Sequence, residues 1–139
     1  MRFVDTNVLL YAVSTAPEEA AKTARARALL DETNLALSVQ VLQEFYVQAT
    51  HARRKDRLTP AQAEGLIEAW LRFPVQASTV ELMRAALAAA GRHRISYWDA
   101  AIIEAARFLG CELVLSDDLS HGQRYDGLRV ENPFAGAGG

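Results

Sequence analysis

The sequence alternates short apolar runs with longer segments of helical periodicity. The run at 112–116, Glu-Leu-Val-Leu-Ser, is brief and apolar at its centre, as expected of a strand buried on both faces of a parallel sheet. Similar runs have the length of strands at 2–5, 35–38, 75–77 and 128–131. Strands that alternate with helices predict an α/β fold, here a three-layer α/β/α sandwich with a mainly parallel central sheet.

Capping residues mark the starts of the helices between these runs. Two Ser/Thr-x-x-Glu/Gln capping boxes, Thr59 with Gln62 and Ser78 with Glu81, each predict a helix, and we expect the second helix to end at Gly91. A proline in the first turn, a serine cap or the apolar spacing indicates the others. The expected helices are one from residue 8, one at 17–32, one after Ser38, one at 60–72, one that Gly91 closes, and one at 97–109 with Gly110 as its left-handed cap.

The chain has 139 residues, the usual size of one domain, and no interdomain linker is visible. We expect a single domain at 1–134, followed by a glycine-rich tail at 135–139 that is too small in its side chains to hold structure alone. The formal net charge is −2, so overall charge predicts no strong attraction to nucleic acid. Any binding of a polyanion must therefore be local.

Secretion, membrane insertion and zinc binding find no support in the sequence. Cys111 is the single cysteine and cannot form an internal disulfide, and no Cys/His cluster has zinc-site spacing. Asp5 and Asn7 interrupt any signal-peptide core, and no run of about 18 apolar residues occurs. We therefore expect a cytoplasmic protein with no membrane partner.

Five acidic residues stand where chemistry is expected. Asp5 ends the first strand, and Asp117 and Asp118 directly follow the strand at 112–116. Ligands of open parallel sheets gather beyond the carboxyl ends of the strands. Glu44 and Asp99 lie on predicted helices among apolar residues that face the core. The sequence thus predicts carboxylates that converge on one edge of the sheet.

Carboxylates brought together repel one another unless a cation neutralises them. Oxygen ligands without cysteine or histidine favour Mg²⁺ or Mn²⁺, and such a site suits phosphodiester hydrolysis. Each acid also has an ordinary interpretation. Asp5 and Asp99 can belong to helix starts, Asp117 and Asp118 to a turn, and Glu44 to an ion pair with an arginine. Only the combination indicates a metal-dependent hydrolase.

Five short motifs, in order along nearly the whole chain, resemble those of the PIN domain nucleases, and among them the VapC-type toxins of toxin–antitoxin pairs. The motifs are Phe-Val-Asp-Thr-Asn-Val-Leu-Leu-Tyr at 3–11, Leu-Gln-Glu-Phe at 42–45, Tyr-Trp-Asp-Ala-Ala-Ile at 97–102, Leu-Ser-Asp-Asp-Leu at 115–119, and a closing Asn-Pro-Phe at 132–134.

The resemblance implies a metal-dependent endoribonuclease. In it, Asp5, Glu44, Asp99 and Asp118 hold one or two Mg²⁺ ions, for which Mn²⁺ can substitute, and metal-bound water attacks the phosphorus of RNA. Asp117 is adjacent to the fourth acid and is the alternative to Asp118. Supporting roles are implied for Thr6, Asn7 and Ser116. The resemblance also implies a small antitoxin as partner and a homodimer.

RNA that approaches an acidic cluster needs basic residues at its rim. Arg92 and Arg94 lead into the Asp99 helix and are the better candidates for phosphate contact. Arg53, Arg54 and Lys55 form the densest basic run, for which a solvated helix end is the competing interpretation. Trp98 could stack on a base, although aromatic residues at a helix start more often pack in the core.

Two other functions compete with cleavage. The chain could be a PIN-fold module that binds RNA or protein without cutting, although a groove for RNA gains nothing from unneutralised carboxylates. A phosphatase of the haloacid dehalogenase type also has an aspartate after its first strand. That chemistry requires a second aspartate two residues later, where this chain has Asn7.

Overall fold

A computed structural model describes residues 1–136 of the chain. The centre of the fold is a six-stranded sheet in the order β3-β2-β1-β4-β6-β5. All neighbouring strands run parallel except the hairpin of β5 and β6, which is antiparallel. The strands are β1 (Arg2–Val4), β2 (Leu35–Ser38), β3 (Val75–Gln76), β4 (Leu113–Leu115), β5 (Arg124–Tyr125) and β6 (Leu128–Glu131).

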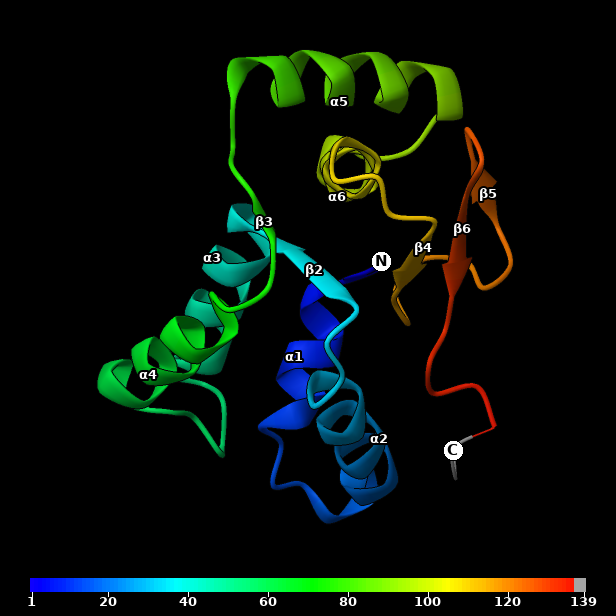
Figure 1. The fold of residues 1–139 in the computed structure, drawn as a ribbon. Helices are drawn as coiled ribbons and strands as arrows, with labels where there is room; N and C mark the ends of the chain where they lie inside the picture. The colour runs from blue at the N-terminus through cyan, green and yellow to red at the C-terminus, as the bar shows by residue number, and fades with distance from the viewer. Residues whose placement is uncertain (137–139) are drawn as a thin grey trace.

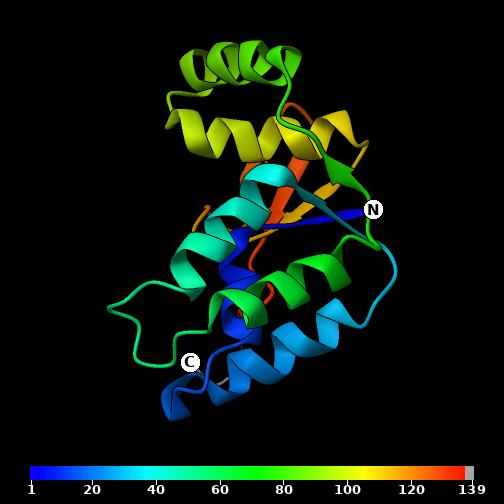
Figure 2. The same ribbon diagram turned by 90° about the vertical axis from the view of Figure 1, so that its left-hand side faces the viewer.

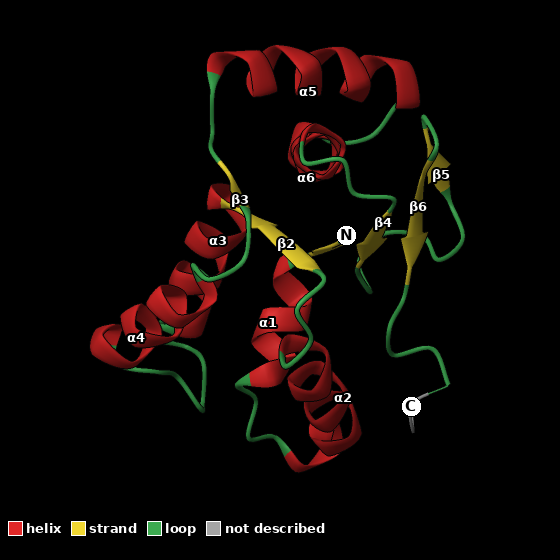
Figure 3. Ribbon diagram, in the orientation of Figure 1, coloured by secondary structure: helices red, strands yellow, loops and turns green. Residues whose placement is uncertain are grey.

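Helices cover both faces of this sheet. Figure 1 shows α6 on one side of the strands, with α5 packed on its outer surface, and α1 and α2 on the other side. Figure 2 shows that α3 and α4 lie on the same side as α2. The helices are α1 (Thr6–Ala12), α2 (Ala20–Leu30), α3 (Val39–Ala49), α4 (Pro60–Trp70), α5 (Val80–His93) and α6 (Tyr97–Phe108). Figure 3 separates the layers by colour, and the predicted three-layer α/β/α sandwich is confirmed.

The connections between strands change direction once. From β1 the chain crosses to its neighbour β2 and then to β3, moving outward along the sheet. It then returns across α5 and α6 to β4, on the other side of β1. The carboxyl ends of β1 and β4 therefore flank the point at which the strand order reverses. In open α/β sheets this switch point is where ligands bind.

The capping signals place most helix starts correctly. The Thr59 hydroxyl accepts a hydrogen bond from the backbone N–H of Gln62, and the Gln62 side chain accepts one from the N–H of Thr59. Ser38 caps α3, and Ser96 accepts a hydrogen bond from the backbone N–H of Asp99 at the start of α6. Because these caps fix the first residues of α3 and α6, they help to position Glu44 and Asp99 relative to the sheet.

Helix α5 differs from its prediction at both ends. The cap is Thr79, whose hydroxyl accepts a hydrogen bond from the backbone N–H of Leu82, so the predicted box of Ser78 with Glu81 is wrong. Gly91 lies inside the helix, which ends at Arg94 in the left-handed conformation with a φ of 56°. The predicted end was wrong because tertiary packing on α6 continues the helix past the glycine.

Other boundaries shift by smaller amounts. The predicted helix at 17–32 begins as a 3₁₀ turn, Pro17–Glu19, before α2, and the helix predicted to reach 72 ends at Trp70. The two-residue strand β5 was not predicted, because a run this short has no periodicity. Gly110 has a φ of 74°, which confirms its predicted left-handed cap.

The tail predicted to be disordered, 135–139, lies mostly outside the described residues, which stop at Gly136 in a turn. None of the helices in the described part of the chain has the length and apolar character needed to cross a membrane.

The left-handed residue at the end of α5 generates a stability prediction. A non-glycine residue in this conformation costs about 1 kcal/mol or more, a cost that glycine avoids. We expect Arg94→Gly to raise the free energy of unfolding by about 1 kcal/mol. The matched control Arg84→Gly, at an exposed position inside the same helix, should lower it by about 1 kcal/mol. Urea denaturation followed by circular dichroism measures both, and a loss of stability in Arg94→Gly contradicts the prediction.

Candidate active site

Asp5 is the centre of the polar network at the switch point. It follows β1, and its side chain is only 7% exposed. Its Oδ1 accepts a hydrogen bond of 2.7 Å from the backbone N–H of Thr6, at the start of α1. Its Oδ2 accepts one of 2.7 Å from the hydroxyl of Ser116, the residue after β4. One buried carboxylate thus joins the ends of the two strands that flank the switch point.

Asn7 connects Asp5 to the loop after β4. Its Nδ2 donates to Asp118 Oδ2 at 3.1 Å and lies 3.4 Å from Asp5 Oδ2, while its Oδ1 accepts a hydrogen bond from the backbone N–H of Asp117. The hydroxyl of Ser116 accepts hydrogen bonds from the backbone N–H groups of Asp118 and Leu119. The amide of Asn7 therefore aligns the carboxylate of Asp118, and not that of Asp117, with Asp5.

Glu44 reaches the same region from α3. Its Oε2 accepts a hydrogen bond of 2.8 Å from the hydroxyl of Thr6, and its Oε1 accepts one of 2.8 Å from Nε2 of Gln40. Gln40 precedes Glu44 by one helical turn, so the two side chains share a face of α3. Both oxygens of Glu44 are held before any ligand arrives.

The acids surround a single cavity of about 450 Å³. Asp99 lines it from the first turn of α6, and Asp117 lines it together with Asp118. All five acids predicted from the sequence thus line one cavity, with the supporting residues Thr6 and Asn7. Six carboxylates and one guanidinium lie in its wall: Asp5, Glu19, Glu44, Asp99, Asp117, Asp118 and Arg54.

Burial and neighbouring charge make the ionised form of Asp5 costly. Its pKa is raised from 3.8 to about 6, mainly by burial, while hydrogen bonds from Ser116 and Thr6 oppose the rise. The negative charges of Asp118 and Glu44 contribute smaller parts of the same rise. Burial also raises the pKa of Asp117, while its hydrogen bond with Tyr11 lowers it. A cation in the cavity would relieve the repulsion around Asp5.

The carboxylates line the cavity but do not converge on one point. In residues 1–136, no three His, Cys, Asp or Glu side chains approach closely enough to form a ready-made metal cage. An ion such as Mg²⁺, which keeps several of its waters and takes one or two carboxylates directly, does not require such a cage. The donor set, all oxygen around a deeply buried aspartate, fits the same ion. Zinc, which prefers closed nitrogen and sulfur sites, does not fit.

The basic residues predicted to contact RNA lie at different distances from the cavity. Arg54 lines it, with its Nε 2.9 Å from Oδ1 of Asp56. Arg53 and Lys55 are exposed in the loop that follows α3 but are not part of the wall, and Arg94 is the exposed residue that ends α5. RNA contact by these residues stays a prediction.

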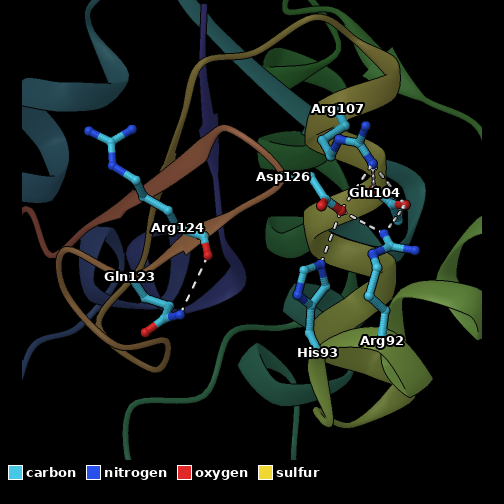
Figure 4. Close-up of polar contacts among 7 residues, drawn as sticks. All are labelled: Arg92, His93, Glu104, Arg107, Gln123, Arg124 and Asp126. Atoms are coloured by element: carbon cyan, nitrogen blue, oxygen red, sulfur yellow. Dashed lines mark hydrogen bonds and ion pairs between the residues drawn. The ribbon is translucent and has the colours of Figure 1, made fainter.

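Arg92, whose contact with RNA also stays a prediction, takes part in an ion-pair network. Figure 4 shows its guanidinium pointing toward Asp126, whose Oδ2 lies 2.6 Å from Nη2. His93 and Arg107 also approach Asp126, and Arg107 binds the carboxylate of Glu104, which is 4% exposed. The network joins α5 and α6 to the β5–β6 hairpin. Arg92 does not line the acidic cavity.

The sequence assigned no role to four polar residues of the cavity, Gln40, Gln48, Tyr11 and Glu19. Gln40 holds Glu44, and its spacing of four residues on a helix is a signal that could have identified it. Tyr11 ends the motif at 3–11 and lines the cavity from α1. No motif marks Glu19, in the 3₁₀ turn before α2, because it reaches the cavity only through the packing of α2 beside α1.

The raised pKa of Asp5 predicts a pH-dependent stability. Between pH 3.8 and about 6 the folded protein binds a proton that the unfolded chain releases, so the contribution of Asp5 to stability falls as pH rises. Asparagine does not titrate and is also a good helix cap. In a chelating buffer, we expect the stability of Asp5→Asn relative to wild type to increase by about 2–3 kcal/mol from pH 4 to pH 7.5.

Urea denaturation across this pH range measures the effect. Asp56→Asn is the control of opposite sign, because a hydrogen bond from the backbone N–H of Thr15 lowers the pKa of Asp56. Its carboxylate stabilises the fold above the unfolded pKa, so this variant should lose stability relative to wild type as pH rises. A pH-independent difference for Asp5→Asn contradicts the prediction.

Comparison with known structures supports the fold assignment. A toxin–antitoxin complex from Klebsiella pneumoniae matches with a TM-score of 0.70 and 18% identity, over 96% of this chain and 98% of that one. VapC20 of Mycobacterium tuberculosis, described as a toxin that cleaves the sarcin–ricin loop, matches with a TM-score of 0.65 and 20% identity, over 85% and 92%. A DNA-bound VapBC from Salmonella typhimurium matches with a TM-score of 0.64 and 19% identity, over 95% and 97%.

The sequence itself gives the family. No curated protein matches this chain in sequence. The family model of the PIN domain, however, matches residues 2–125, a range that includes Asp5, Glu44, Asp99 and Asp118. The chain therefore belongs to the PIN domain family.

Proposed function

We propose that this protein is a metal-dependent endoribonuclease that uses Mg²⁺, or Mn²⁺ in its place, to hydrolyse phosphodiester bonds of RNA. The observation that carries the proposal is the buried Asp5, with Glu44, Asp99 and Asp118 around the same cavity at the switch point of the sheet. Six carboxylates without a bound cation would repel RNA. The same carboxylates around a cation attract a phosphodiester.

Four residues hold the proposed catalytic carboxylates in place. Ser116 and Thr6 bind the two oxygens of Asp5, and Asn7 bridges Asp5 and Asp118. Thr6 and Gln40 fix the two oxygens of Glu44. When bound, one or two divalent ions would polarise the phosphoryl oxygens and lower the pKa of a water molecule. Arg54 lies where it can attract the phosphate backbone into the cavity.

Cleavage of RNA in Mg²⁺ or Mn²⁺ tests the proposal. We expect Asp5→Asn and Asp99→Asn each to lower kcat/KM by about a hundredfold or more, because each removes charge from the proposed metal site. Asp31→Asn, at an exposed acid that does not line the cavity, should cleave like wild type. Equal activity in all four proteins, or activity that a chelator does not reduce, would exclude a metal nuclease. No cleavage by the wild type in either metal, together with retained RNA binding, would support instead a module that binds RNA without cutting it.

The two adjacent acids after β4 are separated by a paired comparison. Because Asn7 aligns Asp118 with Asp5, we propose Asp118 as the fourth acid. We expect Asp118→Asn to reduce kcat/KM at least tenfold more than Asp117→Asn does. Isothermal titration with Mn²⁺ should show the same order in metal affinity. A larger loss in Asp117→Asn would assign the role to Asp117.

We also propose that the nuclease is a cytoplasmic toxin that a small antitoxin inhibits, acting as a homodimer with residues 1–134 as one domain. Structural neighbours that are toxin–antitoxin complexes support this part. Expression of the wild type alone should stop growth, and expression of Asp5→Asn should not. Coexpression with the product of an adjacent small reading frame should restore growth and yield a complex, and sedimentation velocity gives the subunit number. Growth arrest by Asp5→Asn would contradict a toxic nuclease.

A further inference from the structure

The exposed indole of Trp98 has no role in the network described above. Trp98 is 64% exposed, whereas Trp70, the other tryptophan, is 5% exposed and packs against Phe45. Large aromatic side chains are normally buried because they carry much apolar surface. Trp98 instead lies at the rim of the acidic cavity, next in sequence to Asp99. An exposed aromatic ring beside a nuclease site is the usual platform for a nucleobase.

The surrounding residues hold Trp98 in position. Tyr97 packs against it edge to face, with ring centroids 5.0 Å apart and an interplanar angle of 82°. The cap of Ser96 fixes the first turn of α6, to which Trp98 belongs. Nε2 of Gln40 lies 3.4 Å from the carbonyl oxygen of Trp98. The backbone of Trp98 is thus held between α3 and α6, and Tyr97 packs against its ring.

A second cavity, of about 350 Å³, lies between Trp98 and α3. Its wall consists of Gln40, Gln43, Glu44, Val47, Gln48 and Trp98. It shares Gln40, Glu44, Gln48 and Trp98 with the acidic cavity, so the two cavities adjoin. An RNA chain with one phosphate in the acidic cavity would have a neighbouring nucleotide within reach of the indole.

The chemistry of this wall fits a base better than a phosphate. It contains no Lys or Arg, and the carboxylate of Glu44 repels a phosphate. Gln43 and Gln48 are exposed, and each side-chain amide offers donors and an acceptor to the edge of a base. Val47 is 60% exposed and adds an apolar surface beside the ring. A flat, neutral heterocycle with a polar edge matches these groups.

We propose that Trp98, Gln43 and Gln48 form a nucleobase subsite that receives an unpaired base of the RNA next to the cleaved phosphodiester. Trp98 stacks on the face of the base, and Gln43 and Gln48 bind its edge. The inference rests on the proposed RNA substrate and adds a determinant of which nucleotide is accepted. A protein side chain or a second copy of this chain is the competing occupant.

The subsite can be tested without cleavage, in Mg²⁺ and with oligomers whose phosphodiester linkages resist hydrolysis. Short single-stranded oligomers of A, U or C should quench the fluorescence of Trp98 when they bind, while the buried Trp70 gives a constant background. Inorganic polyphosphate, which has the charge but no base, should not quench it. We expect Trp98→Ala to weaken oligomer binding, measured by anisotropy of a labelled oligomer, by about tenfold to a hundredfold. Trp98→Phe should restore most of the affinity.

Two sets of variants complete the design. Phe108→Ala, at an exposed aromatic on the far end of the same helix, should bind like wild type. Gln43→Ala and Gln48→Ala should reduce the differences in affinity among the three oligomers. Wild-type affinity in Trp98→Ala overturns the proposal. So does a Trp98→Ala variant that changes the subunit number in sedimentation velocity and leaves RNA affinity unchanged, because a second copy then covers this face.

The measurements that would refute the base subsite differ from those that would refute the proposed nuclease. If the wild type cleaves RNA and Trp98→Ala cleaves it with the same kcat/KM, the nuclease stands and the subsite is wrong. If no RNA is cleaved in Mg²⁺ or Mn²⁺ but oligomers still quench Trp98, the nuclease is wrong and the subsite is supported as a site for RNA binding.

Discussion

The position of the Asp5 carboxylate depends on the pairing of two parallel strands. Val4 pairs with Leu115, so Asp5 and Ser116 leave the sheet side by side, and the backbone N–H of Asp5 donates to the carbonyl oxygen of Leu115 at 3.0 Å. The hydrogen bond from the Ser116 hydroxyl to Asp5 then closes the junction. A slip of one residue in this register would turn the side chains of β4 to the opposite face. The junction of Asp5 and Ser116 also positions Asp118, through Asn7 and the Ser116 hydroxyl.

The surrounding core maintains an arrangement that is unfavourable in itself. Phe3, Val4 and Leu115 are fully buried beside the junction, and their burial supplies free energy that offsets the cost of an ionised, desolvated aspartate. Short strands suffice for this purpose, because both faces of β1 and β4 are covered by helices. The fold therefore tolerates a cluster of like charges at one edge, which the proposed cation would neutralise.

The sequence predicted what depends on local rules. The strand at β4, the caps at Thr59 and Ser96 and the convergence of Asp5 with Glu44, Asp99 and Asp118 all follow from periodicity and spacing. The pairing of Arg92 with Asp126 was not predictable, because it depends on how the β5–β6 hairpin meets α5. Val80, Met83 and Leu87 recur at helical spacing, a pattern that favours a core face, yet all three are exposed on α5. Sequence periodicity identifies an apolar face but not whether another element covers it.

The side chain of Gln40 binds no ligand in the proposed mechanism, yet it connects the proposed metal site with the proposed base site. The amide nitrogen of Gln40 has two N–H bonds, and its two acceptors are the carboxylate of Glu44 and the carbonyl oxygen of Trp98. This amide therefore links a carboxylate of the proposed metal site to the backbone of the residue whose indole forms the proposed base site. A cation that moved Glu44 would be coupled through this contact to a base that moved the first turn of α6. Linkage requires such a coupling free energy to be the same in both directions.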